Sequence, residues 1–348
     1  MPEVFIISAA RTPLGQGEIL AAEPDEPPFV QTELSYTVLQ AAMQRLGVDR
    51  SRLETVIWGD PDGISLHNAL IHSGMPALSP GILVGGGPLA GQQAIHFAAQ
   101  AILAGDLDLA LAGAVTAFPV TQNGLCFDPI LRPLAERWAL DWSLDRDELD
   151  ALASRPNDRL ASTAETKPTA SLVQVGELLD RDQPQQALSI ETLRTLAPQS
   201  PLTEAHFPAC GCAAAAVSLA SIRAVEQDAL APRACLDARS LVSLGRDQAW
   251  AGILPATQHA LHRARLELSD IDLFQVSADF LGVEAVWARE FHVPLEKRLP
   301  MRVYLGQASG AVALVELLDQ LEAQGLHSAM LAAASHNGLG CATILERK

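Results

Sequence analysis

The chain has 348 residues, of which 49% are hydrophobic and 19% charged, and its formal net charge is −17. This is the composition of a soluble globular protein that is long enough to bury a large core. Because so acidic a chain repels phosphate groups, we exclude DNA, RNA and anionic membrane surfaces as partners. No apolar run reaches the roughly 18 residues of a membrane span, so we expect no transmembrane helix.

The start of the chain and its cysteines indicate a cytoplasmic protein. The opening apolar run, residues 4–7, is too short for a secretory signal and has no basic flank. The five cysteines are odd in number and irregular in spacing, so we expect free thiols. The nine histidines show no spacing typical of a zinc site, and we expect no metal.

A unit of helix, turn and apolar strand recurs along the chain. The matched pairs are residues 93–113 with 310–334, and residues 36–58 with 255–276. In the first pair the turn glycines, Gly105 and Gly325, are 220 positions apart, and the second pair has an offset of 218. Two such pairs at nearly one offset predict an internal duplication. Each unit alternates helix and strand, which is typical of an α/β protein with short buried strands.

The stretch between the two copies differs in composition. Residues 118–205 carry 14 acidic and 8 basic residues and eight prolines, which predicts an inserted, irregular loop domain. We expect short helices at residues 143–154, with Ser143 as the N-cap, and at residues 189–196. The expected domains are an amino-terminal half at 1–117 completed by about 206–232, a loop domain at 118–205 and a carboxy-terminal half at 233–348.

Several short motifs then occur in the order found in one known family. They are SAARTPLG at residues 8–15, the helix and strand at residues 91–113, LSDIDL at residues 268–273 and the GLG turn with its final strand at residues 338–346. Together with the duplication, these motifs resemble the thiolase family. The resemblance covers most of residues 1–116 and 186–348 and is weak between them.

The resemblance implies the thiolase fold. That is an α/β architecture of duplicated βαβαβ halves in five αβαβα layers, here with a shortened loop domain. It also implies a dimer built through the amino-terminal sheets. Members of the family make or cleave carbon–carbon bonds between acyl-CoA thioesters, and the chain is similar to an acetyl-CoA C-acyltransferase.

The positions that carry catalysis in the family hold other residues here. Thiolase chemistry needs a thiolate that accepts the acyl group. Its place at the start of a helix falls on Pro88, which has no nucleophile. The catalytic histidine falls on Gln307, the oxyanion-binding asparagine on Ser277 and the second catalytic cysteine on Ala334. The resemblance therefore predicts a degenerate member that is inactive as a thiolase.

Three residues elsewhere are alternative catalytic candidates: His336, on the turn that carries the family's second cysteine, and the thiols Cys126 and Cys210. CoA or acyl-CoA is a candidate ligand, and no other cofactor is implied. The formal charge of −6 in the loop domain, from 8 basic and 14 acidic residues, disfavours a ligand with several phosphate charges.

Three hypotheses about function follow. The leading one is a non-catalytic, thiolase-like structural or regulatory subunit of an acyl-CoA-metabolising assembly, as a homodimer or paired with an active thiolase-fold subunit. The second is an acyl-CoA acyltransferase or thioesterase that uses Cys126, Cys210 or water activated by His336. The third is a binding protein for a small molecule or acyl chain. Fold alone does not decide between them.

Overall fold

The computed structural model describes residues 3–16, 27–61, 63, 65–75, 79–117, 131–155, 170–183, 188–196, 201–301 and 303–347. The strands of this part of the chain form one hydrogen-bonded sheet in the order β4-β3-β5-β6-β1-β7-β11-β10-β8-β9, with β2 added beside β6. The strands of the first half are β1 (Val4–Arg11), β2 (Gly15–Gln16), β3 (Thr55–Gly59), β4 (Gly81–Leu83), β5 (Leu109–Ala117) and β6 (Gly211–Ser221). Those of the second half are β7 (Ala234–Ser243), β8 (Leu273–Ser277), β9 (Arg298–Leu299), β10 (Ser328–Ala334) and β11 (Leu339–Glu346).

The two halves of this sheet have the same topology. The order β4-β3-β5-β6-β1 in the first half corresponds to β9-β8-β10-β11-β7 in the second. In each half the first three strands are parallel and the last two pairings are antiparallel. The halves join where β1 pairs with β7 at Phe5–Cys235 and Ile6–Ala234. The duplication predicted from the repeated helix–turn–strand units is therefore confirmed.

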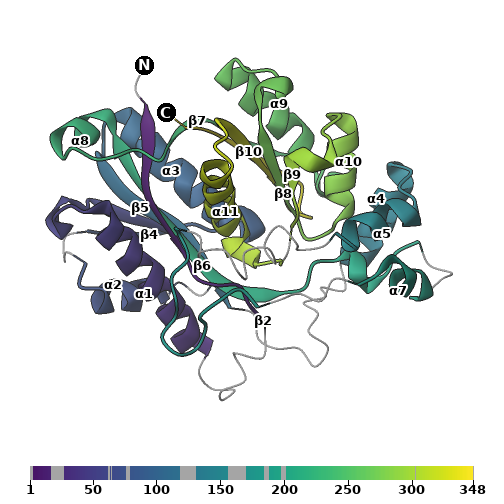
Figure 1. Cartoon of the computed structure of the whole chain (residues 1–348), viewed down its shortest axis with the longest axis horizontal. Coiled ribbons are helices and arrows are strands. Elements are labelled where there is room, and N and C mark those ends of the chain that lie inside the picture. The colour runs from purple at the N-terminus through teal and green to yellow at the C-terminus, as the bar shows by residue number, and fades with distance from the viewer. Residues whose placement is uncertain are drawn as a thin grey trace.

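Helices cover this sheet in three layers, as Figure 1 shows. Helices α1 and α2 pack on the outer face of the first half, and α9 and α10 on the outer face of the second. Between the halves lie α3 and α11, and α11 contacts strands of both. The five-layer thiolase fold expected from the sequence is thus confirmed. The bounds of these helices and of α8 are α1 (Pro27–Leu46), α2 (Ser65–His72), α3 (Ala90–Ala104), α8 (Ile222–Gln227), α9 (Ile253–Ala264), α10 (Gly282–Glu290) and α11 (Ser309–Ala323).

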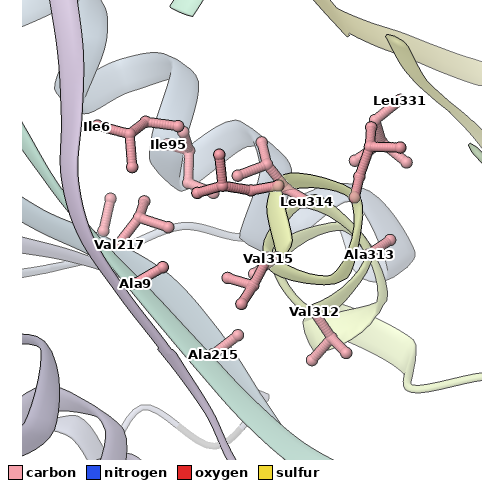
Figure 2. Close-up of a cluster of buried hydrophobic side chains, with 14 of the residues drawn as sticks. Ile6, Ala9, Ile95, Ala215, Val217, Val312, Ala313, Leu314, Val315 and Leu331 are labelled. Atoms are coloured by element: carbon pink, nitrogen blue, oxygen red, sulfur yellow. The ribbon is translucent and has the colours of Figure 1, made fainter. Parts of the chain in front are cut away.

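The two central helices are apolar on nearly every side because sheet or helix surrounds them. Figure 2 shows α11 between Ala215 and Val217 of the first half and Leu331 of the second. Helices α3 and α11 approach each other closely at their amino-terminal ends. A Cβ atom at Gly91 would lie 2.9 Å from the carbonyl oxygen of Gln307 and 2.8 Å from the Cβ of Ala114. Only glycine fits there, and the contact fixes how the two helix starts face each other.

In the region expected to form the loop domain, the structure describes α4 (Leu131–Asp141), α5 (Arg146–Ala153) and α7 (Ile190–Thr195). The expected N-cap at Ser143 is wrong. Asp145 caps α5 instead, its side chain accepting a hydrogen bond from Glu148 N, and Ser143 has a φ of 51° outside the helix. The helix expected at residues 189–196 is confirmed, with Ser189 as its N-cap.

Helix α4 was not expected, because we interpreted Pro133 as a break. Proline is tolerated in a helix's first turn, where its missing N–H would have no intrahelical acceptor, and Pro133 is the third residue of α4. Among the described residues, no helix is both long and apolar enough to cross a bilayer.

Candidate functional site

The four positions to which the resemblance assigns thiolase catalysis lie at one end of the central layer. Pro88 lies in the turn that leads into α3, and Gln307 in the turn that leads into α11. Ser277 ends β8 and Ala334 ends β10, and these parallel strands are hydrogen-bonded neighbours. Leu89, next to Pro88, packs in one cluster with Ala333, next to Ala334. The fold therefore brings the four positions together.

Pro88 is buried in the short 3-10 turn Gly87–Leu89. The preceding glycines, Gly86 and Gly87, have φ values of 142° and 58°, so the backbone is in a left-handed conformation immediately before the helix. A thiolate at this helix start would be favoured by the helix dipole. Proline supplies neither a thiol nor an N–H group, so this position can form no acyl-enzyme.

Gln307, which the resemblance puts in place of the family's histidine, is half-buried. Its buried side-chain oxygen Oε1 has no hydrogen-bond partner among the described residues. The next residue, Ala308, donates its N–H to Thr116 Oγ1 at 3.1 Å, which holds the turn against the first half. A glutamine amide can donate a hydrogen bond to a carbonyl oxygen, but it cannot take up a proton at neutral pH. The position can orient a ligand but cannot act as a base.

Ser277 and Ala334 are both buried, and neither titrates at neutral pH. Ser277 lines a small cavity between β8 and α11, with about 20 Å³ of space, enough for about one water molecule. Gln275, two residues earlier on β8, lines the same cavity, and its oxygen Oε1 has no partner in the described part of the chain. The cavity is therefore polar beside Ser277 and suited to an ordered water.

His336 forms a hydrogen-bonded pair that the sequence analysis did not foresee. Its Nδ1 lies 2.8 Å from Oδ2 of Asp279, and the other oxygen of Asp279 accepts a hydrogen bond from the indole N–H of Trp250. The Asp279 carboxylate is 1% exposed, whereas the His336 side chain is 30% exposed. A buried carboxylate that orients a partly exposed imidazole is the arrangement of a histidine general base.

The meeting of Asp279 and His336 follows from strand topology. Asp279 lies two residues after β8 and His336 two residues after β10. Because β8 and β10 are parallel neighbours, residues just beyond their carboxyl ends lie at one edge of the sheet. Asp279 lies two residues after Ser277, which the resemblance puts in place of the family's asparagine, and the resemblance gave no reason to select Asp279 itself. An acid and a histidine after two predicted parallel strands were the signal available in the sequence.

Of the two thiols proposed from the sequence, the structure describes only Cys210. Cys126 lies outside the described residues. Cys210 is half-buried, and its backbone pairs with Tyr304. Its neighbour Cys212 is fully buried in β6, where burial raises the pKa of the thiol to about 11. A thiol that stays protonated at neutral pH is a poor nucleophile.

One further thiol lies under the start of α3. Cys341 accepts a hydrogen bond from Gln93 Nε2 at 3.1 Å and lies 3.8 Å from His96 Nδ1. Burial raises the pKa of the Cys341 thiol far above its usual range, and burial lowers the pKa of His96 to about 3. Both groups are therefore neutral, and His96 bonds Thr343 Oγ1 at 2.7 Å. The pair is part of the core rather than an activated thiolate.

Comparison with known proteins agrees with this architecture. Residues 4–118 match the family described as the thiolase N-terminal domain. The structure of human mitochondrial 3-ketoacyl-CoA thiolase superposes with a TM-score of 0.86 at 21% identity, covering 100% of this chain and 99% of that one. The amino-terminal part of the chain therefore matches the thiolase N-terminal domain, and the whole chain has the thiolase fold.

Several curated proteins are similar to this chain along its whole length. A steroid 3-ketoacyl-CoA thiolase of Mycobacterium tuberculosis is 26% identical over 100% of this chain and 95% of that protein. An acetyl-CoA acetyltransferase of Escherichia coli is also 26% identical, over 100% of both. A beta-ketoadipyl-CoA thiolase of Pseudomonas aeruginosa is 27% identical over 99% of both. The similarity therefore includes both thiolase halves.

Proposed function

We propose that this thiolase-fold protein does not catalyse cysteine-dependent acyl transfer and serves as a structural or regulatory subunit of an acyl-CoA-metabolising assembly. The observation that carries the proposal is Pro88 at the start of α3, where the family's nucleophile would stand. The acyl group of a thioester has no thiolate to receive it there. Gln307 and Ala334 remove the proton-transferring imidazole and the second thiol from the same place.

The surface of the amino-terminal half supports association with another chain. The edge strand β4 is exposed along its whole length, and Ile82 and Leu83 are 47% and 48% exposed. Phe97 of α3 is 44% exposed. An open edge strand with large apolar side chains favours pairing with a further strand. We propose that a second copy of this chain, or a catalytically complete thiolase-fold subunit, pairs here.

The proposal is tested by the intact mass of the purified protein after incubation with acetyl-CoA and with acetoacetyl-CoA. We expect an unchanged mass and no thiolysis of acetoacetyl-CoA in the presence of CoA. An added acetyl mass would contradict the proposal, and peptide mapping would then show whether Cys126 or Cys210 carries it. A matched sample of an active thiolase provides the positive control.

The subunit role has a test of its own. We would express the chain with an affinity tag in the organism it comes from. During gel filtration it should either retain a second thiolase-fold chain or elute as a homodimer. A strictly monomeric protein at micromolar concentration would overturn the subunit proposal, whatever the result of the mass measurement.

A further inference from the structure

The turn that carries His336 is braced from several sides. Within the turn, Gly338 N donates to Ser335 O at 3.1 Å and Ser335 N donates to Leu339 O at 3.0 Å. From outside, Leu244 N donates to Gly338 O at 3.0 Å, and Trp250 N donates to Ser335 O at 3.2 Å. Ser335 is completely buried. The backbone beneath His336 is therefore held in one conformation.

Trp250 holds both the histidine turn and the carboxylate. Its backbone N–H bonds the turn at Ser335, and its indole N–H bonds Asp279, while the Trp250 side chain is itself completely buried. The ring packs against Phe280 with centroids 5.7 Å apart. Asp279 can therefore change neither its rotamer nor its distance from His336 without disturbing the core. Such support is what a catalytic imidazole needs in order to keep one orientation.

The hydrogen bond to Asp279 also determines the chemical form of His336. A carboxylate accepts the Nδ1–H, so in the neutral imidazole the lone pair lies on Nε2. The carboxylate then stabilises the imidazolium that forms when Nε2 takes up a proton. Two further side chains that can donate hydrogen bonds, Ser277 and Gln307, stand at positions assigned to catalysis by the resemblance. Ser277 ends β8, and Gln307 lies in the turn before α11.

We propose that the Asp279–His336 pair activates water for the hydrolysis of acyl thioesters. His336 Nε2 takes a proton from water as the water oxygen bonds to the thioester carbonyl carbon. The carbon–sulfur bond then breaks, and the leaving thiolate takes the proton from the imidazolium. The products are a carboxylic acid and a thiol, and no oxidant or further reactant is needed. Asp279 acts as the positioning residue.

This activity goes beyond the proposed subunit role and does not depend on it. It needs no acyl-enzyme, so an unchanged protein mass is compatible with it. The substrate class is an acyl thioester. Because the chain carries a net charge of −17, we expect an uncharged acyl-pantetheine to be accepted at least as well as acyl-CoA. Acetyl-CoA and acetyl-pantetheine are therefore the probes.

The experiment measures thiol release from both probes with a chromogenic thiol reagent. The full-length protein should release thiol, and His336→Asn should lower kcat by ~100-fold, the usual contribution of a general base. His259→Asn is the matched control, because His259 is an exposed histidine on α9. Thiol release from neither probe would overturn the proposal, as would an unchanged kcat in His336→Asn.

Asp279→Asn distinguishes positioning from a purely structural role. An asparagine keeps an oxygen for the Trp250 N–H but no longer stabilises the imidazolium. We therefore expect kcat to fall at least 10-fold, which corresponds to about 1.4 kcal/mol of lost stabilisation. KM and the melting temperature should stay close to the parent values. The parent enzyme should also turn over more slowly in D₂O, because proton transfer is part of the step. Equal kcat values for Asp279→Asn and the parent would contradict the assigned role.

Discussion

Asp279 and His336 are 57 residues apart in the sequence and meet through a 2.8 Å hydrogen bond just beyond the ends of two neighbouring parallel strands. This bond also connects the candidate site to the core, because the Trp250 indole donates to the same carboxylate. Removing the carboxylate would leave a buried indole N–H without its acceptor.

Asp279→Ala should therefore lower the free energy of unfolding by about 1–3 kcal/mol, the cost of a buried donor that loses its partner. Urea unfolding followed by tryptophan fluorescence measures the change, since Trp250 is itself in the affected cluster. Asp279→Asn is the control and should lose less, because it retains an acceptor oxygen. Equal losses in the two variants would show that the hydrogen bond from the Trp250 indole contributes nothing to the free energy of unfolding.

The free energy of unfolding should fall as the pH is lowered through the range in which histidine side chains become protonated. His206 is completely buried, and burial lowers the pKa of its imidazole, although its 2.7 Å bond to Asp150 opposes that shift. The unfolded state therefore binds the proton more readily than the native state. The resulting stability is present above the unfolded pKa of 6.5 and is lost as the pH falls below it.

Asp150 should also lower the free energy of unfolding on acidification, but at lower pH than His206. Burial alone would raise the pKa of its carboxyl, but hydrogen bonds from His206 and Arg146 lower it below the usual range. Its contribution is thus lost as the pH falls through the folded pKa. Urea unfolding between pH 8 and pH 3 should show a slope of up to ~1.4 kcal/mol per pH unit for each group, with the His206 part below pH 6.5 and the Asp150 part at the acid end, below the ordinary carboxyl value of 3.8. His206→Gln should flatten the upper part of the curve, whereas the exposed-site variant His259→Gln should leave it unchanged.

The close contact between α3 and α11 predicts that adding one methyl group at Gly91 lowers the stability of the protein. Gly91→Ala places a Cβ within 2.9 Å of the Gln307 carbonyl oxygen and of the Ala311 Cβ, where the backbone must move. We expect a loss of about 1–3 kcal/mol, as for an overpacked core, measured as a drop in melting temperature. Gly85→Ala is the matched control, because nothing lies within 4 Å of a Cβ there. A Gly91→Ala variant as stable as the control would contradict this account of the helix crossing.

The exposed edge strand makes the association surface testable. Ile82→Lys combined with Leu83→Lys places two charges on β4 and should shift the protein from dimer or heteromer to monomer in gel filtration with light scattering. The melting temperature of the monomer should change little if both side chains face solvent in the isolated chain. Leu140→Lys on α4, 78% exposed, is the control. An unchanged assembly in the β4 variant would place the interface elsewhere.

The fold could be predicted because its evidence is periodic. Gly105 and Gly325 each follow a central helix and precede a buried strand, so their offset of 220 positions in the sequence revealed the two halves. The topology then repeats strand for strand. Local capping was harder to predict. Ser143 and Asp145 are both good N-cap residues, and only the structure shows that Asp145 has the extended backbone a cap needs.

The site was only partly predictable for a different reason. Pro88 and Gln307 could be found by position, because the thiolase-like motifs around them imply where the family's catalytic residues would stand. Asp279 could not, since its role depends on a partner on another strand and a tryptophan on a third element. The residues of such a pair have no characteristic separation in the sequence. It follows from strand order, which the motifs alone did not give.

The order of the strands also constrains how the chain can fold during its synthesis. Strand β6, residues 211–221, lies between β5 and β1 and pairs with both. The first strand made by the ribosome therefore lacks its neighbour until nearly two thirds of the chain has been translated. An amino-terminal fragment that stops before β6 leaves β1 and β5 with open edges, and such edges promote aggregation. We therefore expect the nascent chain to be most prone to aggregation before β6 has been made, a risk set by topology rather than by any catalytic residue.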